Sequence, residues 1–256
     1  MSPVRVAIAG ANGRMGLALL EAAATTEGVA LGAAVDLKAS TWGGVSIGTD
    51  LGGALQASDV VIDFTRPEGT LEHLRACVAA KRAMVIGTTG FTPAQMNEIR
   101  AAAKKIAIVM APNMSVGVNV AMRLVELASK SLGPDYDVEV FEMHHRKKVD
   151  APSGTALKLG EVAAAARGAS LDENGVFERY GTTGERKAGT IGFSVARGGD
   201  VVGDHTVYFA GPGERIEITH RSNSRANYAQ GAMRAARFVA GREAGLYDMQ
   251  DVLGLR

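Results

Sequence analysis

The chain has 256 residues, of which 46% are hydrophobic and 21% are charged, and its formal net charge is +1. This balance is typical of a soluble globular protein and argues against broad electrostatic capture of nucleic acid or of an anionic membrane. The longest apolar runs, among them Val4–Ala11, fall well short of the roughly 20 residues that span a bilayer. We therefore expect neither a nucleic-acid partner nor a membrane segment.

Short apolar runs alternate with alanine-rich amphipathic stretches through the first half of the chain. The runs are Val4–Ala9, Val29–Val35, Val60–Phe64, Met84–Ile86 and Ile106–Met110, and the helical stretches are Met15–Thr25, Pro67–Ala80 and Pro93–Lys105. Continuous apolar strands separated by helices are typical of a parallel sheet covered on both faces. The pattern predicts an α/β fold with a doubly wound parallel sheet, and a loop with a short helix between Val35 and Val60.

The pattern changes in the second half. A helix near Val118–Ser131 is followed by a strand at Asp137–Glu142, a polar cluster and a helix through Leu157–Ala166; further strands are predicted at Thr190–Ala196, Thr206–Phe209 and Ile216–His220. Strands joined by Gly-rich turns predict a C-terminal α+β domain with an open mixed sheet. We expect a mobile loop at Gly168–Gly189. The last helical pattern, Ala226–Ala240, resembles the first half and is expected to pack back onto it.

A glycine-rich segment joins the first strand to the first helix. Its sequence, Gly10-Ala11-Asn12-Gly13-Arg14-Met15-Gly16, has the spacing G-x-x-G-x-x-G, a variant of the dinucleotide fingerprint. That fingerprint needs a tight turn, close approach of the backbone to a pyrophosphate, and close helix–strand packing. We predict a Rossmann-type domain that binds NADH, NADPH or both through Gly10, Ala11, Asn12, Gly13, Arg14 and Met15. A plain strand-to-helix turn is the alternative.

Further coenzyme contacts are predicted where strands end. Asp36 ends the second strand, where a carboxylate would accept hydrogen bonds from the adenosine ribose, which favours NAD. Lys38 and Arg14 are candidates to meet a 2′-phosphate, whereas Leu37 offers that group nothing. The carboxyl ends of parallel strands border the ligand crevice, so the ends of the fourth and fifth strands should contact the nicotinamide side. These residues are Gly87, Thr88, Thr89, Ala111, Pro112, Asn113 and Met114. A solvated strand end and ordinary turns are the alternatives.

The segment from His144 to Thr155 concentrates two histidines, two lysines and a predicted helix start in twelve residues. A metal site is disfavoured, because adjacent histidines on an extended segment point to opposite sides and nearby lysines repel a cation. A solvated basic turn with one packed histidine is a second interpretation. The third is an anion pocket, in which the backbone N–H groups of Gly154 and Thr155 act with Lys148 and a histidine. Beside a nicotinamide, such a pocket predicts hydride transfer followed by protonation.

The segment Glu142–Ala156 resembles the signature of the dihydrodipicolinate reductases, also called 4-hydroxy-tetrahydrodipicolinate reductases, of lysine and diaminopimelate biosynthesis. The similarity extends through Gly10–Gly16, Gly87–Gly90, Asn113–Asn119, Gly199–His205 and Gly213–His220. This resemblance implies NAD(P)H-dependent reduction of a cyclic dicarboxylate imine to tetrahydrodipicolinate. It also implies a Rossmann-type domain, a substrate domain with an open sheet, and a homotetramer built through those sheets.

The resemblance also implies roles for particular residues. His144 matches the proton donor or acceptor, Lys148 the general acid, and His145 a contact of the substrate carboxylate. Gly154 and Thr155 match the substrate-binding pair, to which we add Ser153 at the helix start. Asp36 matches the acidic ribose contact, while Leu37 departs from the arginine that often follows it in members that use NADPH.

These features predict two domains. Residues 1–115 and 225–256 would form a discontinuous dinucleotide-binding domain, and residues 116–224 a domain for substrate binding and oligomerisation. The alternatives are another two-domain NAD(P)-dependent dehydrogenase of amino-acid metabolism and a non-catalytic NAD-binding sensor, neither of which needs the polar cluster.

Cys77 is the single cysteine, so the sequence holds no disulfide framework and no cysteine-based zinc site. It lies in a helical pattern, and we expect it in the core. The strand pattern starts at Val4, so we expect no leader peptide and a cytoplasmic location.

Overall fold

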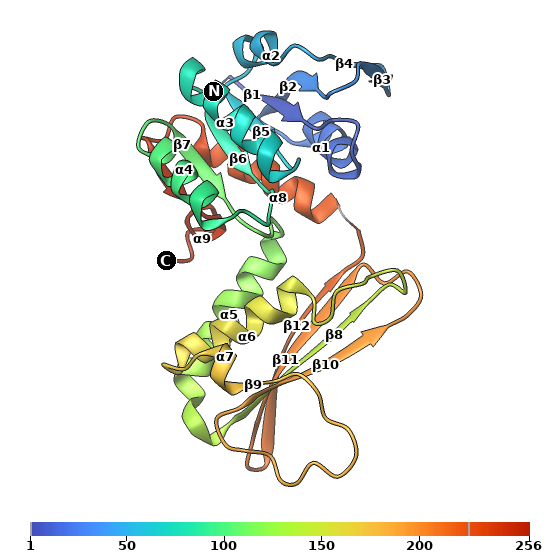
Figure 1. Ribbon diagram of the computed structural model, residues 1–256, viewed down its shortest axis with the longest axis vertical. Coiled ribbons are helices and arrows are strands. Elements are labelled where there is room, and N and C mark those ends of the chain that lie inside the picture. Colours follow the sequence, from blue (N-terminus) through green and yellow to red (C-terminus); the bar gives the residue numbers. More distant parts are fainter. Residues whose placement is uncertain (1, 225) are drawn as a thin grey trace. The chain divides into compact units, whose positions relative to one another are not determined.

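The computed structural model describes residues 2–224 and 226–256, which divide into two compact units. The first unit holds the residues up to Val116 together with those from Ala226 onward, and the second holds Gly117–Ser224. Figure 1 shows the last helices, in red, beside the blue and green elements of the first unit. The C-terminal segment therefore returns to the unit in which the chain began.

The first unit is built on a six-stranded sheet. Its order is β13-β7-β6-β5-β1-β2, and every pair of neighbouring strands is parallel. The strands are β1 (Val4–Ala9), β2 (Val29–Val35), β5 (Val60–Asp63), β6 (Ala83–Ile86), β7 (Ala107–Met110) and β13 (Gly245–Tyr247). The predicted doubly wound parallel sheet is confirmed.

Helices cover both faces of this sheet. On one face lie α1 (Arg14–Thr25), α8 (Ala226–Val239) and α9 (Met249–Leu253); on the other lie α2 (Leu51–Ala57), α3 (Pro67–Ala80) and α4 (Pro93–Ala103). In β5, Val60 and Ile62 belong to the first core and Val61 to the second. Because alternate side chains point to opposite faces, a strand buried on both sides must be apolar throughout, which explains the continuous runs. Cys77 is buried in the second core, as expected.

Two features of the first unit were not predicted. One is the edge strand β13, whose three residues are too few to show a strand pattern. The other is a hairpin of β3 (Ser40–Trp42) and β4 (Val45–Ile47), which stands before the short helix α2 in the link from Val35 to Val60. Gly43 and Gly44 turn the hairpin with φ values of 54° and 82°, and two positive φ angles are what a tight two-residue hairpin turn requires.

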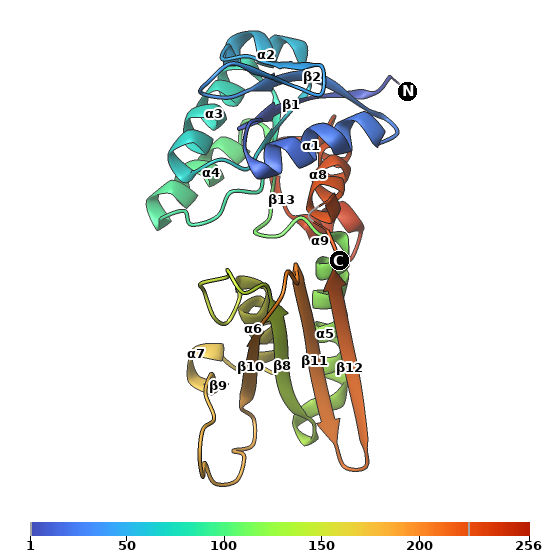
Figure 2. The same cartoon turned by 90° about the vertical axis from the view of Figure 1, so that its right-hand side faces the viewer.

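The second unit has a five-stranded mixed sheet with helices on one face. Its order is β12-β11-β8-β10-β9, in which β8, β10 and β9 are parallel and β11 is antiparallel to both of its neighbours. The strands are β8 (Asp137–His144), β9 (Gly175–Val176), β10 (Ile191–Arg197), β11 (Gly203–Gly211) and β12 (Glu214–Ser222). Figure 2 shows β10, β8, β11 and β12 side by side, with α5 and α6 behind them. The predicted open mixed sheet is confirmed.

Three helices supply the apolar cover of the second sheet. They are α5 (Val116–Leu132), α6 (Gly154–Ala166) and α7 (Leu171–Asn174). Val125, Leu159 and Phe209 are among the residues of this core. The longest of the described helices, α5, has 17 residues, and none in the described ranges is long and apolar enough to cross a membrane.

The segment Gly168–Gly189 contains regular elements that the sequence did not predict. It contains α7 and β9, and its polar remainder is attached to β8 by ion pairs. Glu139 on β8 accepts hydrogen bonds from Arg179 at 2.7 and 2.9 Å and from Arg186 at 3.1 Å. These partners lie at least forty positions away in sequence, so a local pattern of glycines and charges did not reveal them.

Candidate functional site

The glycine loop of the first unit has the geometry that a dinucleotide needs. Gly10 has a φ of +72°, and a Cβ there would lie 2.7 Å from Thr65 Cγ2. A Cβ on Gly16 would lie 2.3 Å from the carbonyl oxygen of Gly10, so only glycine lets α1 start this close to the loop. The N–H of Gly13 donates to that same oxygen at 3.0 Å, which closes the turn.

The first turn of α1 also fits a pyrophosphate. Within the described chain, Gly13 provides no side-chain cap for α1, and the first helical turn carries no acidic residue. The N–H groups at a helix start favour an anion, and here no carboxylate of the first turn competes for them. The residues present therefore fit the phosphate part of the predicted coenzyme.

Asp36 contacts the glycine loop directly. Its carboxylate accepts one hydrogen bond from the N–H of Asn12 at 2.9 Å and another from the N–H of Leu37 at 2.7 Å. The side chain of Asn12 donates to the carbonyl of Lys38 at 2.8 Å. Each carboxylate oxygen keeps a second lone pair, so Asp36 can still accept from ribose hydroxyls. The structure thus brings Asn12, Asp36 and Lys38 together, while the Leu37 side chain is 95% exposed.

The predicted coenzyme contacts, in the glycine loop and at the ends of β6 and β7, differ in whether their side chains are exposed. The side chains of Ala11, Thr88 and Met114 are buried, with exposed fractions of 0%, 5% and 1%. Thr88 lies within hydrogen-bond distance of Thr70 Oγ1, at 2.8 Å, and Met114 belongs to the first core. Any coenzyme contact by these three residues must therefore come from main-chain atoms. The side chains of Arg14, Thr89 and Pro112 are exposed.

A buried polar network behind these strand ends was missed. Asp63, the last residue of β5, is fully buried and accepts hydrogen bonds from the main chain of Thr65 at 2.8 Å and from Thr70 Oγ1 at 2.9 Å. His73 Nδ1 lies 2.6 Å from the other carboxylate oxygen. The sequence signal was available: an acidic residue ends an apolar strand, and hydroxyl and imidazole groups follow within ten positions.

In the second unit, the helix start predicted after Pro152 is confirmed. Ser153 caps α6 by accepting a hydrogen bond from the N–H of Ala156 at 3.2 Å. The same hydroxyl lies 3.0 Å from His205 Nε2, and the Ser153 N–H donates to Glu142 at 3.0 Å. A Cβ on Gly154 would meet nothing within 4 Å, so the helix start is open on the Gly154 side.

His144 lies at the end of β8 and is 8% exposed. Its Nδ1 atom is 2.5 Å from Glu142, and its ring meets the ring of His205 edge-on with centroids 5.1 Å apart. Burial lowers the pKa of His205 to about 4, and repulsion from His144 acts in the same direction. His205 is therefore neutral near neutral pH.

Glu142 is fully buried and ionised. Its carboxylate accepts two hydrogen bonds from Arg197, both at 2.9 Å. Burial disfavours the charged form, but the hydrogen bonds from Arg197, His144 and Ser153 outweigh it and hold the pKa of Glu142 below its usual value. None of Glu142, Arg197 and His205 is among the site residues predicted from the sequence. For Glu142 a signal existed, since it stands two positions before His144 on the same strand face.

The loop after β8 holds His145 and Lys148. The Lys148 ammonium donates to Asp150 at 2.9 Å, and this ion pair holds the pKa of Asp150 below its usual value. The N–H of Lys148 donates to the His145 carbonyl at 3.1 Å, and a cis Ala151–Pro152 bond then leads into α6. The structure thus places His144, His145 and Lys148 on one short segment of this unit.

One ring nitrogen of His145 has no hydrogen-bond partner among the described residues. This atom, Nδ1, is buried. The described part of the chain contains no group of three or more histidine, cysteine or acidic side chains arranged to hold a metal ion.

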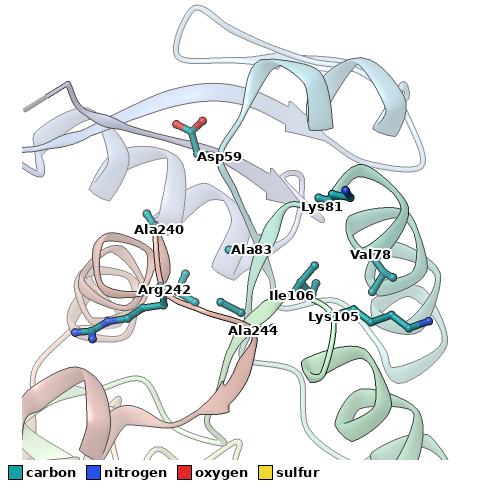
Figure 3. A pocket seen from close by; sticks show the side chains of 12 residues that line it. Asp59, Val78, Lys81, Ala83, Lys105, Ile106, Ala240, Arg242 and Ala244 are labelled. Atoms are coloured by element: carbon teal, nitrogen blue, oxygen red, sulfur yellow. The ribbon is translucent and has the colours of Figure 1, made fainter.

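A cavity of about 580 Å³ lies at the amino ends of the strands of the first sheet, the end opposite to the glycine loop. It is lined by residues at or before the amino ends of β5, β6 and β7, among them Asp59, Ala83 and Ala107. Figure 3 shows that the charged ends of Arg242 and Lys105 point in different directions there. None of the predicted site residues lines this cavity, because the glycine loop and the other predicted contacts follow the carboxyl ends of the parallel strands.

Comparison with known proteins extends over nearly the whole chain. A family model described as "Dihydrodipicolinate reductase, N-terminus" matches residues 4–114, and one described as "Dihydrodipicolinate reductase, C-terminus" matches residues 117–253. A protein of Bordetella pertussis named 4-hydroxy-tetrahydrodipicolinate reductase is 58% identical over 265 positions, covering 99% of this chain and 98% of the relative. A protein of the same name from Burkholderia mallei is 55% identical and covers 100% of both chains.

Solved structures agree with this similarity. A dipicolinate-bound dihydrodipicolinate reductase from Paenisporosarcina sp. TG-14 superimposes with a TM-score of 0.81 at 26% identity, covering 97% of this chain and 98% of that one. A probable dehydrogenase from Thermotoga maritima, 13% identical with a TM-score of 0.61 over 97% of this chain and 92% of its own, shows likeness of fold alone. The two family models and the full-length relatives lead to one conclusion: the chain belongs to the dihydrodipicolinate reductase family.

Proposed function

We propose that the protein reduces 4-hydroxy-tetrahydrodipicolinate to tetrahydrodipicolinate, with the glycine loop binding the coenzyme and the His144–Thr155 segment binding the substrate. As a member of this family the chain is an NAD(P)H-dependent oxidoreductase. The observation that supports the residue assignment is that Glu142 contacts both His144 Nδ1 and the Ser153 N–H at the start of α6, with Lys148 on the loop between them. The bound coenzyme supplies the hydride for this reaction.

The start of α6 and His145 suit a substrate carboxylate. Gly154 and Thr155 begin the helix, where N–H groups and the helix dipole favour an anion. His145 Nδ1, buried without a partner, adds a group that can donate to the same carboxylate when it carries a proton. Ser153 stabilises this helix start by capping it, and the space beside Gly154 stays open.

Lys148 is the residue we assign to protonate the substrate. Its ammonium has three donors, and Asp150 takes one of them at 2.9 Å. The Lys148 side chain is 20% exposed, so the remaining donors have access to a ligand. His144 would hold or relay the same proton. Its imidazole is nearly buried, and its Nδ1 atom already contacts Glu142.

On the coenzyme side, the glycine loop would hold the pyrophosphate and Asp36 the adenosine ribose. Asp36 supports binding of NADH through its remaining lone pairs. Arg14 and Lys38 are both exposed and supply the positive charge that a 2′-phosphate of NADPH needs. We therefore propose that both coenzymes are used.

The test is a steady-state assay that follows coenzyme oxidation with and without 4-hydroxy-tetrahydrodipicolinate. We expect oxidation only when the substrate is present, with both NADH and NADPH, and competitive inhibition by dipicolinate. Oxidation that needs no dicarboxylate, or no oxidation with either coenzyme, would contradict the proposal. Coenzyme binding without turnover would instead favour a non-catalytic NAD-binding module.

We further propose that the protein forms a homotetramer through the open face of the second sheet. This face lies opposite the core formed with α5, α6 and α7, and it carries Phe141 and Tyr208 on neighbouring strands. Phe141 is 36% exposed, so its ring is available to be covered by a second copy of the chain. Light scattering should give the mass of four chains, and Phe141→Asp should yield smaller species. A monomeric wild type would overturn this proposal.

A further inference from the structure

We propose that the buried Glu142–Arg197 pair is the positioning pair of the substrate site, which sets the tautomer of His144 and joins it to the Lys148 loop and the start of α6. The inference rests on the proposed function of that site. Neither residue touches the substrate in this scheme; both act through other groups.

The strand register brings the pair to His144. In the β8–β10 ladder Arg197 is the direct neighbour of His144, and in the β8–β11 ladder His205 is the direct neighbour of Glu142. Glu142 and His144 are two positions apart on β8, so their side chains leave the same face of the sheet. Three strands therefore bring these four side chains together beside the start of α6.

The contacts of Glu142 use all of its hydrogen-bonding capacity. One oxygen accepts from the Ser153 N–H at 3.0 Å and from Arg197 at 2.9 Å; the other lies 2.5 Å from His144 Nδ1 and accepts from Arg197 at 2.9 Å. A carboxylate offers about four lone-pair sites, and here each has a donor. Glu142 has no site left for a substrate or a transferred proton, so its role is to hold other groups.

The carboxylate decides which nitrogen of His144 carries the proton. An ionised carboxylate only accepts hydrogen bonds, so Nδ1 must be protonated to contact Glu142. In the neutral ring, Nε2 is then the free base. Gly203 faces this atom, since a Cβ there would lie 2.9 Å from His144 Nε2. A glycine at that position leaves Nε2 the space to exchange a proton.

Arg197 connects the same carboxylate to the loop that carries the proposed acid. Besides its two bonds to Glu142, its guanidinium donates to the main-chain carbonyl of Asp150 at 2.7 Å. The Asp150 side chain in turn binds the Lys148 ammonium. A change in Arg197 should therefore displace Lys148 as well as His144.

The charged and titratable groups around His144 come from each neighbouring strand. Glu142 lies on its own strand, Arg197 on β10 and His205 on β11, with His220 beyond on β12 and Lys148 on the following loop. The pKa values of His205 and His220 are lowered by burial, so both histidines favour the neutral form. Glu142 is therefore the negative charge in direct contact with the imidazole.

The experiment compares Glu142→Gln with Glu139→Gln. Glu139 is a matched control because it lies on the same strand and also binds arginines, but it has no contact with His144. We expect Glu142→Gln to lower kcat by about 10²–10⁴-fold, the range of a lost proton-transfer group, without changing the Kd of NADH. Glu139→Gln should change neither quantity.

A double variant separates positioning from general damage to the fold. If Glu142 acts through His144, then Glu142→Gln combined with His144→Ala should lose no more activity than His144→Ala alone. Arg197→Ala should be rescued by added guanidinium but not by ammonium. Additive losses, or a Glu142→Gln variant with the wild-type kcat, would overturn the inference while leaving the proposed function intact.

A spectroscopic readout makes the inference testable without turnover. NMR of the protein labelled with nitrogen isotope in histidine should show His144 protonated at Nδ1 in the wild type, and this preference should be lost in Glu142→Gln. A wild-type ring protonated at Nε2 only would refute the tautomer assignment. If the wild type shows no reductase activity, the proposed function fails, and this measurement still decides the role of Glu142.

Discussion

His73 Nδ1 lies 2.6 Å from a carboxylate oxygen of Asp63, which is fully buried at the end of β5. Burial opposes the charge on each partner, yet their contact outweighs it. It holds the pKa of Asp63 below its usual value and raises the pKa of His73. The pair thus behaves as an ion pair inside the first unit, and Thr65 and Thr70 complete its hydrogen bonds.

The His73–Asp63 pair should make stability depend on pH in a defined direction. The pKa of His73 is higher in the folded protein, so its contribution is complete below the unfolded value of about 6.5 and is lost as pH rises through the folded value. The wild type should therefore exceed His73→Gln in free energy of unfolding by more at about pH 6 than at about pH 9. Urea unfolding measures this difference. Arg75→Gln, an exposed change on the same helix, should show no such trend.

His205 should destabilise the protein in acid. Burial lowers its pKa to about 4 in the folded state, so the unfolded chain binds more protons between about pH 6.5 and 4, and stability falls as pH falls through that window. The full effect is roughly 3 kcal/mol. Unfolding curves across this window should show a loss in the wild type that is smaller in His205→Gln. Parallel losses in the two proteins would refute this assignment.

Gly16→Ala should weaken coenzyme binding. The new Cβ would lie 2.3 Å from the Gly10 carbonyl oxygen, so α1 must move away from the loop. Overpacking of this kind costs about 1–3 kcal/mol. We expect the Kd of NADH to rise by roughly five- to a hundredfold, as measured by fluorescence titration. Gly52→Ala in α2 is the control, because its Cβ would meet only a side-chain oxygen of Asp50 at 3.3 Å; an equal effect there would contradict the prediction.

Leu37→Arg should shift coenzyme preference toward NADPH. The Leu37 side chain is 95% exposed beside Asp36, so an arginine there needs no repacking to reach a 2′-phosphate. A hydrogen bond to a charged group contributes about 1.5–3 kcal/mol, which corresponds to roughly ten- to a hundredfold in the ratio of kcat/KM for NADPH to that for NADH. Leu37→Gln, which adds length without charge, should leave the ratio nearly unchanged. An unaltered ratio in Leu37→Arg would place the adenosine ribose elsewhere.

Lys148→Ala should lower kcat by about 10²–10⁴-fold, because it removes the proposed general acid. The neighbouring Lys147 is exposed, and Lys147→Ala should keep the wild-type rate. His144→Ala should lower turnover more than it weakens coenzyme binding. A Lys148→Ala enzyme with the wild-type kcat would show that the acid assignment is wrong.

Local patterns in the sequence were sufficient for most of the fold. The strands of the first sheet are apolar throughout because both of its faces are buried, and this makes them visible without tertiary information. The glycine spacing before α1 and the Pro152–Ser153 start of α6 were equally local signals. Strand β13 escaped because three residues are too few to establish a period.

Only some of the residues of the candidate site could be recognised from the sequence. His144, Lys148 and the α6 start stand within twelve residues, so their chemistry could be recognised by proximity in the chain. The side chains that hold these residues in place could not be recognised in this way, because they are distant in the sequence. Arg197 is 55 positions from Glu142, and His205 is 52 positions from Ser153.

The sequence by itself therefore determined the two kinds of sheet and the glycine loop, and it supplied the candidate residues for anion binding and proton transfer. Only the tertiary structure decided how those residues are held, because strand pairing and helix docking join groups that no local pattern relates. It buried Thr88 and Met114, whose side chains the sequence had left available to a ligand. It also filled every lone pair of Glu142, a fact that depends on β8, the start of α6 and β10 meeting at one carboxylate.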